Sequence, residues 1–173
     1  SREALFAFAQ VAIDATRPGA RFTDPHEAAV RVLTEGMLDL GLLDRNQDGT
    51  LEDAIANRRY FAHYMHRTGH WIGMDVHDCG SYVEPSERGQ ASERTDPLSG
   101  EVIKDRPSRI LRAGMALTIE PGIYVRPSEK VPKEFWNIGI RIEDDALVTD
   151  AGCELITRDV PVAADEIEAL MRA

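Results

Sequence analysis

Hydrophobic residues recur with helical spacing in the first quarter of the chain. Between residues 2 and 16 the apolar positions follow a period of about 3.6 residues, which predicts an amphipathic helix ending at Pro18-Gly19. A second helix is predicted to have Asp24 as its N-cap, Pro25 at its first helical position and Gly41 as its stop. Its apolar face consists of Ala29, Val32, Leu33, Met37 and Leu40.

The pattern changes in the second half of the chain. From Leu111 onwards the apolar runs are short, alternate with polar residues, and are separated by glycine or by a Pro-Gly pair, which is typical of β-strands. Residues 163–172 return to helical spacing. The sequence therefore predicts a mixed α+β fold.

Two of the predicted strands run into a glutamate. Residues 116–119 lead to Glu120, and residues 139–142 lead to Glu143. Because successive side chains of a strand point to opposite faces, Leu117 can enter a core while Glu120 faces away from it. The same alternation groups Leu117 with Ile119, Thr118 with Glu120, and Arg141 with Glu143. A carboxylate supported by a packed strand can be aimed at a metal ion.

A histidine cluster, His66, His70 and His77, lies upstream of these strands. Histidine is the commonest metal ligand and a proton carrier near neutral pH, so the cluster and the two glutamates together predict a metal site. The spacing of His66 and His70 is that of the HExxH zinc-protease helix, but Arg67 stands where the glutamate base is required. Interspersed glycines favour an extended loop, in which a bend at Gly73 would bring His70 and His77 into one cleft.

Length and composition narrow the function classes. The 173 residues suit one domain, which can bury about 70% of the surface exposed by the unfolded chain. Thirty acidic and 20 basic residues give a net charge of −10, which opposes nucleic-acid binding. No apolar stretch approaches the roughly 20 residues of a membrane span. Cys79 and Cys153 are far apart, which predicts free, buried thiols and a reducing compartment such as the cytoplasm.

Residues 44–49 match the opening of a calcium-binding EF-hand loop, including its glycine at the sixth position. The twelfth position is Ile55, where a bidentate glutamate is required, and no apolar pattern of a partner helix follows. We therefore expect a polar connection between helices rather than a calcium site.

Three ordered motifs resemble one known family. They are residues 66–78, residues 111–124 with Glu120-Pro121-Gly122, and residues 139–145 with their Glu-Asp-Asp ending. The chain resembles the pita-bread metallopeptidases, and most closely the aminopeptidase P (Xaa-Pro aminopeptidase) family. The resemblance implies a curved antiparallel sheet with helices packed on its outer face. It also implies that residues 1–173 are the carboxy-terminal part of one catalytic domain.

The resemblance implies a dinuclear centre, usually of manganese with zinc or cobalt as alternatives, held by two aspartates, one histidine and two glutamates. By motif match His70, Glu120 and Glu143 would be metal ligands, and Glu120 would also act as general acid and base. His66 and His77 would be substrate-side groups, and Arg141 would steady the carboxylates and the developing charge. A metal-bound hydroxide would attack the bond before proline in a peptide that has proline at its second position.

The two aspartate ligands that the resemblance implies upstream of His70 have no match, because every aspartate before His70 falls in a predicted helix, at a cap, or in or beside the 44–49 segment. We expect at most one weakly bound ion in this chain, little activity of the chain alone, and a homo-oligomer or a complementing chain as partner. Without cations Glu120 and Glu143 would repel, so that one takes up a proton or the pair splays.

Two alternatives remain open at this stage. A prolidase, which cuts Xaa-Pro dipeptides, has similar motifs, and the loop of residues 126–137 with Phe135-Trp136 is a candidate for setting substrate length. A pita-bread domain without its aspartates can instead serve as a non-catalytic peptide-binding module. The three matching ligands disfavour that module, because a scaffold has no need for them.

Overall fold

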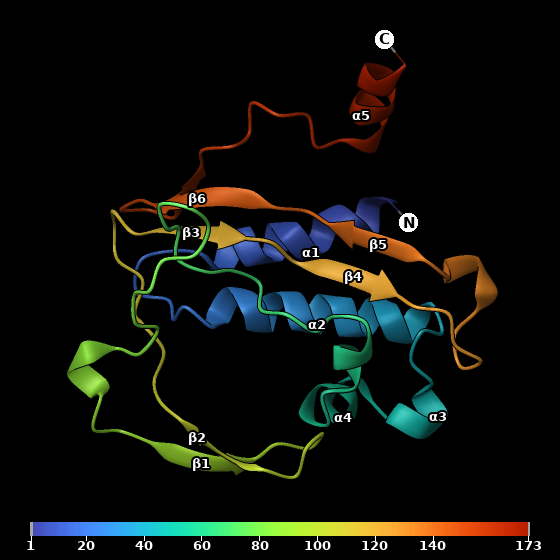
Figure 1. The fold of residues 1–173 in the computed structure, drawn as a ribbon, viewed down its shortest axis with the longest axis horizontal. Helices are drawn as coiled ribbons and strands as arrows, with labels where there is room; N and C mark the ends of the chain where they lie inside the picture. Colours follow the sequence, from blue (N-terminus) through green and yellow to red (C-terminus); the bar gives the residue numbers. More distant parts are fainter. Residues whose placement is uncertain (1, 173) are drawn as a thin grey trace.

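The computed structural model describes residues 2–172, with side chains described from residue 8 onward. Its order of elements is helical at the start, then irregular, then a run of antiparallel strands, with a final short helix (Figure 1). The mixed α+β class is confirmed. Leu5 and Phe6, two apolar positions of the first predicted helix, lie outside the described side chains.

Both predicted amino-terminal helices are present, as α1 (Arg2–Ala15) and α2 (Asp24–Asp39). The predicted cap of α2 is wrong by one residue: Thr23 is the N-cap, and the Asp24 carboxylate accepts the Arg21 N–H at 2.8 Å instead. Gly41 does end the helix, with φ of +70°, because a left-handed residue there costs glycine little.

The segment after α2 is a polar connection, as predicted, and it contains two short helices, α3 (Arg45–Asp48) and α4 (Leu51–Ala56). Thr50 caps α4 through a reciprocal pair of hydrogen bonds with Asp53. Three 3-10 turns, η1 (Arg59–Ala62), η2 (Pro85–Glu87) and η3 (Lys133–Phe135), and the helix α5 (Ala164–Met171) complete the helical elements.

The strands after residue 111 form one bent ribbon. Strand β3 (Ala116–Ile119) pairs with β6 (Asp144–Val148), and β4 (Gly122–Val125) pairs with β5 (Ile138–Arg141), all antiparallel. Strand β7 (Cys153–Leu155) adds to the other edge of β6. In Figure 1, β3 and β4 follow one another along one side of the ribbon and β5 and β6 along the other, with α1 passing behind.

Small side chains let the helices approach this ribbon closely. Ala12 of α1, Ala29 of α2, Ile119 of β3 and Ala146 of β6 form one buried cluster. A larger cluster, built on α1, α2 and Tyr64, also receives Val125 of β4. The helices therefore cover one face of the ribbon, which fixes the position of β3 and of the residues that follow it.

Two features differ from expectation. Cys79 is exposed, so its predicted burial is wrong, whereas Cys153 is half-buried beside α1 and both thiols are free. The hairpin of β1 (Ser92–Thr95) and β2 (Val102–Asp105) has no predicted counterpart. All four β1 residues are exposed, so the strand lacks the apolar alternation by which it could be recognised.

None of the helices within residues 2–172 is both long and apolar enough to span a membrane.

Candidate metal centre

Both glutamates lie where the ribbon is interrupted. The last pair of the first ladder is Ile119 with Asp144, and the second ladder begins with Gly122 opposite Arg141. Glu120-Pro121 on one side therefore lies across from Ile142-Glu143 on the other. Because ladders hold the chain before and after this break, two carboxylates 23 positions apart in sequence are brought together on a rigid frame.

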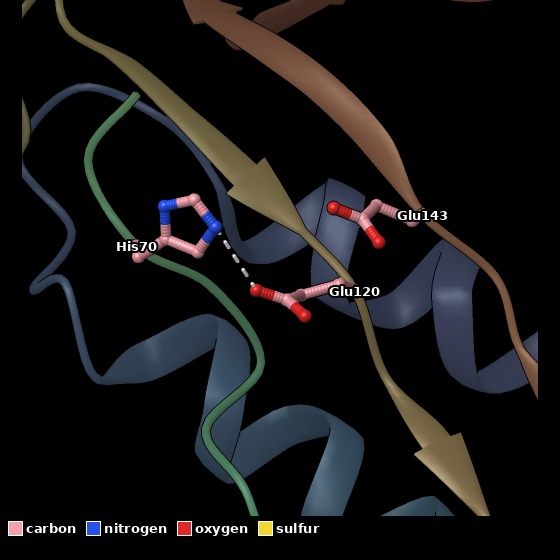
Figure 2. A group of neighbouring side chains, drawn as sticks. All are labelled: His70, Glu120 and Glu143. Carbon is pink, nitrogen blue, oxygen red and sulfur yellow. Dashed lines mark ion pairs between the residues drawn. The ribbon is translucent and has the colours of Figure 1, made fainter. Parts of the chain in front are cut away.

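The third member of the site comes from the glycine-rich loop. His70, Glu120 and Glu143 offer one ligand atom each, and these atoms lie within 4.8 Å of one another (Figure 2). Among the residues the structure describes, this is the group of side chains with metal-ligand geometry. The His70 and Glu120 side chains are only 13% and 10% exposed, whereas Glu143 is exposed.

Hydrogen bonding fixes the His70 ring for ligation. Its Nδ1 lies 2.9 Å from the carbonyl oxygen of Trp71, which can only accept, so Nδ1 carries the proton. The lone pair is then on Nε2, which lies 3.4 Å from Glu120 Oε1. A metal-binding imidazole is usually oriented by a hydrogen bond from its non-ligating ring nitrogen to an acceptor such as a backbone carbonyl.

The donor atoms fit a divalent ion. When the His70 ring is neutral, the tautomer that Trp71 selects turns its Nε2 lone pair towards a carboxylate oxygen of Glu120, and a divalent cation between these two acceptors would satisfy both. Atoms bound to one ion at about 2.0–2.2 Å lie within roughly 4.4 Å of each other, so the observed 4.8 Å requires movements of a few tenths of an ångström. One imidazole with two carboxylates suits ions such as manganese or zinc.

Arg141 and Tyr124 connect Glu120 to His66 through an ion pair and two hydrogen bonds. Arg141 Nη1 lies 3.2 Å from Glu120 Oε2, and Arg141 Nε donates to the Tyr124 hydroxyl at 2.8 Å. That hydroxyl lies 3.1 Å from His66 Nε2, while His66 Nδ1 donates to the Arg67 carbonyl at 2.7 Å. Tyr124 therefore donates to His66, and its link with Arg141 is the main cause that raises the pKa of the guanidinium.

Gly122 makes this arrangement of Tyr124 possible. A Cβ at Gly122 would lie 2.9 Å from the Tyr124 hydroxyl and 3.0 Å from the Ile140 carbonyl, both too close. Since Gly122 pairs with Arg141 and Tyr124 with Gly139, the tyrosine and the arginine are diagonal neighbours on one face of the ribbon. Tyr124 lies within the motif of residues 111–124, but its role depends on the β4–β5 register, which the sequence does not show.

The loop with the histidines has the predicted glycine-dependent bend. Ile72 bridges to His77, and the Gly73 N–H donates to the Val76 carbonyl at 3.1 Å. The His70 and His77 rings lie edge to face with centroids 4.2 Å apart, and His77 is exposed beside the site. The bend at Gly73 is confirmed, because a Cβ there would come within 2.4 Å of the His77 backbone.

Backbone contacts attach this loop to β3. The Thr118 N–H donates to the His70 carbonyl at 2.9 Å, and the His70 N–H donates to Thr118 Oγ1 at 3.0 Å. Thr118 Oγ1 in turn donates to Glu120 Oε1 at 3.2 Å. Thr118 was expected on the face of Glu120, and strand alternation was the signal that could have assigned it this role.

The two carboxylates lie close together. Their ligand atoms remain within the 4.8 Å group, and Arg141 pairs with Glu120. The guanidinium supplies positive charge where two like charges meet, which reduces their repulsion. Phe135 and Trp136, the candidates for setting substrate length, pack partly buried against the main core.

Comparison with known proteins identifies the class. Residues 3–150 match the model of metallopeptidase family M24, and the chain belongs to this family. The match covers the helices α1 to α4 from residue 3 onward, the histidine loop and both glutamates, and it ends before α5. The chain accordingly has part of the pita-bread fold, with a curved antiparallel sheet that is not closed.

Individual relatives are named as Xaa-Pro aminopeptidases, Xaa-Pro dipeptidases or aminopeptidases. The Xaa-Pro aminopeptidase of Escherichia coli strain K12 is 40% identical over 91% of this chain and 30% of its own length. The Xaa-Pro dipeptidase of Rattus norvegicus is 35% identical over 98% of this chain and 35% of its own. The structure of Pseudomonas aeruginosa aminopeptidase PepP aligns with a TM-score of 0.78 at 43% identity, over 99% of this chain and 34% of that one. The chain thus spans about a third of the length of these relatives.

Proposed function

We propose that this chain is the carboxy-terminal part of the catalytic domain of a proline-specific aminopeptidase. The protein would release the first residue from peptides that have proline at the second position. The observation that carries the proposal is the convergence of His70, Glu120 and Glu143 from three separate segments within 4.8 Å. Relatives named Xaa-Pro aminopeptidase supply the substrate class.

We propose that His70, Glu120 and Glu143 hold manganese, with zinc or cobalt as alternatives. When bound, the metal would lower the pKa of a water molecule and polarise the peptide carbonyl. The proton transfers would be carried out by this chain's own residues. Glu120, held by Thr118 and Arg141, would accept a proton from the attacking water and deliver it to the leaving nitrogen.

The other candidates have roles on the substrate side. His77 is exposed beside His70 and would hold the carbonyl of the bond to be cleaved. His66 accepts a hydrogen bond from Tyr124 and would shuttle protons on the substrate side, while Arg141 holds the Tyr124 hydroxyl in place. Arg141, 44% exposed, would stabilise negative charge that develops beside Glu120.

We propose further that two aspartate ligands reside in a segment outside this chain. The described aspartates before His70 lie in or at the helices α1 to α4, away from any strand. The isolated chain would then bind at most one ion weakly and have little activity, and a second copy or a complementing chain would complete the site. The free thiols favour a reducing compartment such as the cytoplasm.

The test combines metal binding with peptide hydrolysis. Titration of the isolated chain with Mn²⁺, followed by electron paramagnetic resonance, should detect weak binding of about one ion per chain. Hydrolysis of an Xaa-Pro-Yaa tripeptide should be at least roughly 100-fold slower than for the chain extended by the upstream segment of its relatives. Full activity of the isolated chain would contradict the missing-ligand proposal. An absence of any Mn²⁺ binding would contradict the metal site itself.

A prolidase is the second candidate, favoured by the 35% identity to Xaa-Pro dipeptidases of rat and mouse. Hydrolysis rates on substrates of different length, measured with the chain extended by the upstream segment of its relatives, distinguish the two activities. An aminopeptidase should cleave Xaa-Pro-Yaa peptides at least as well as Xaa-Pro dipeptides. A strict preference for the dipeptide would reassign the chain to the prolidases.

A further inference from the structure

Three parts of the molecule that hold the metal centre meet at Thr68. Its hydroxyl oxygen lies 2.9 Å from Nδ1 of His26, in the first turn of α2, and also contacts the hydroxyl of Tyr64. Its carbonyl accepts the N–H of Glu120 at 2.6 Å. Thr68 is 2% exposed and Tyr64 is fully buried, so these bonds are shielded from bulk solvent.

The polar groups around Thr68 satisfy one another. Burial raises the pKa of the Tyr64 phenol, which therefore keeps its proton. Burial, followed by the nearby Arg67 and His66, lowers the pKa of His26 to about 4, so its ring is neutral at ordinary pH. A neutral imidazole and a phenol can each donate or accept, and either direction gives the Thr68 hydroxyl one donor and one acceptor partner.

A small hollow lies between the start of α2 and the loop, and its lining includes Phe22, His26, Arg67, Thr68 and Leu117. Side chains across a gap lose the close contacts that would hold them in one position. The hydrogen bonds of Thr68 to His26 and Tyr64 run beside this hollow.

We propose that the Thr68 hydroxyl is a positioning group of the metal centre, which ties the His66–His70 loop to α2 and so sets His70 and the Glu120 backbone relative to each other. The inference rests on the proposed metal site for its functional meaning. Thr68 touches neither substrate nor metal, and it acts through His70, two residues away, and through the N–H of Glu120.

The experiment compares Thr68→Val with Thr68→Ser. Valine keeps the shape and loses the hydroxyl, whereas serine keeps the hydroxyl. In the metal-free chain, Thr68→Val should speed amide hydrogen exchange at Glu120 and Thr118 by at least roughly tenfold. With Mn²⁺ it should weaken binding by about tenfold, the lower end for groups that orient ligands. Thr68→Ser should restore both values towards those of the unmodified chain.

Thr34→Val is the matched control. Thr34 is another fully buried threonine, and its hydroxyl donates to the Val30 carbonyl at 2.6 Å within α2. Its loss should lower stability without a selective change in exchange at Glu120 or in Mn²⁺ binding. If Thr34→Val alters both quantities as much as Thr68→Val does, the effect is general destabilisation and the proposal is overturned.

The remaining outcomes separate this inference from the proposed function. If the unmodified chain binds no Mn²⁺, the metal site fails, while hydrogen exchange still decides the role of Thr68. If Thr68→Val does not fold, His26→Leu is the second variant. It removes one of the two side-chain partners of the Thr68 hydroxyl and should also speed exchange at Glu120. Unchanged exchange at Glu120 in every folded variant overturns the positioning role.

Discussion

The two glutamates and the histidines of the candidate site are held in different ways. Glu120 and Glu143 lie at the break of a ribbon whose ladders continue on both sides. His66, His70 and His77 lie on a loop without regular structure, apart from isolated bridges to β3 and within itself. Strand ladders fix a ligand by repeated backbone bonds, whereas the loop depends on a few individual contacts. Single substitutions should therefore disturb the histidine side more easily.

Loss of a ligand should have the largest effect. Glu120→Ala removes a carboxylate that contacts His70 and Arg141, so Mn²⁺ affinity should fall by more than roughly 100-fold. Isothermal titration calorimetry measures the change. Glu154→Ala, the same substitution at an exposed position of β7, is the control and should leave affinity unchanged. Equal affinities of the two variants would remove Glu120 from the ligand set.

Gly69→Ala tests the attachment of the loop to β3. A Cβ at Gly69 would lie 2.0 Å from the Thr118 carbonyl oxygen, a backbone atom that cannot move aside without moving the strand. The free energy of unfolding should fall by about 1–3 kcal/mol, measured by urea denaturation, and Mn²⁺ binding should weaken with it. Gly36→Ala is the control: it is in the interior of α2 with open space around it, and should stabilise by about 0.5–1 kcal/mol. A neutral Gly69→Ala would show that the loop is free to shift.

Tyr124→Phe tests the chain from Arg141 to His66. The ring stays, while the hydroxyl that accepts from Arg141 and donates to His66 is lost. We expect a loss of about 1 kcal/mol in stability and a fall in Mn²⁺ affinity of about tenfold at most, because the ligands themselves remain. Tyr60→Phe in η1 controls for loss of a phenol elsewhere. An unchanged affinity would restrict Tyr124 to a structural role.

Glu84→Gln should have the smallest effect on the metal centre and a clear effect on acid stability. The Glu84 side chain is 2% exposed and accepts from Arg112, the Ile110 N–H and Ser86, and these bonds, led by Arg112, lower its pKa to about 2. A carboxyl with a depressed folded pKa stabilises the fold above its unfolded pKa of 4.5, and this contribution is lost as pH falls towards 2.

The measurement for Glu84 is thermal unfolding at several pH values. The difference between the unmodified chain and Glu84→Gln should be largest above about pH 5 and should shrink progressively between pH 4.5 and pH 2. A difference that does not depend on pH would show that the ionised carboxylate is not what stabilises this part of the fold. Mn²⁺ affinity at neutral pH should be the same in both proteins.

Hydrophobic periodicity correctly predicted the helices and strands that bury one face. Both long helices and the strands from residue 116 onward follow their apolar patterns, because the buried side must be apolar for the element to pack. The β1–β2 hairpin was missed, since neither strand buries a complete face. The N-cap of α2 was displaced by one residue because Asp24 is recruited by the Arg21 N–H, a local contact that competes with capping.

The sequence by itself determined the chemical types and their order: an imidazole at position 70, carboxylates at 120 and 143, glycines where the loop must bend, and the likeness to a metallopeptidase family. Only the tertiary structure decided that these groups share one point, that Tyr124 connects Arg141 to His66, and that Thr68 ties the loop to α2. Periodicity reports which face of an element is buried. Contacts between residues 17 to 73 positions apart depend instead on strand register and helix packing, which many parts of the chain set together.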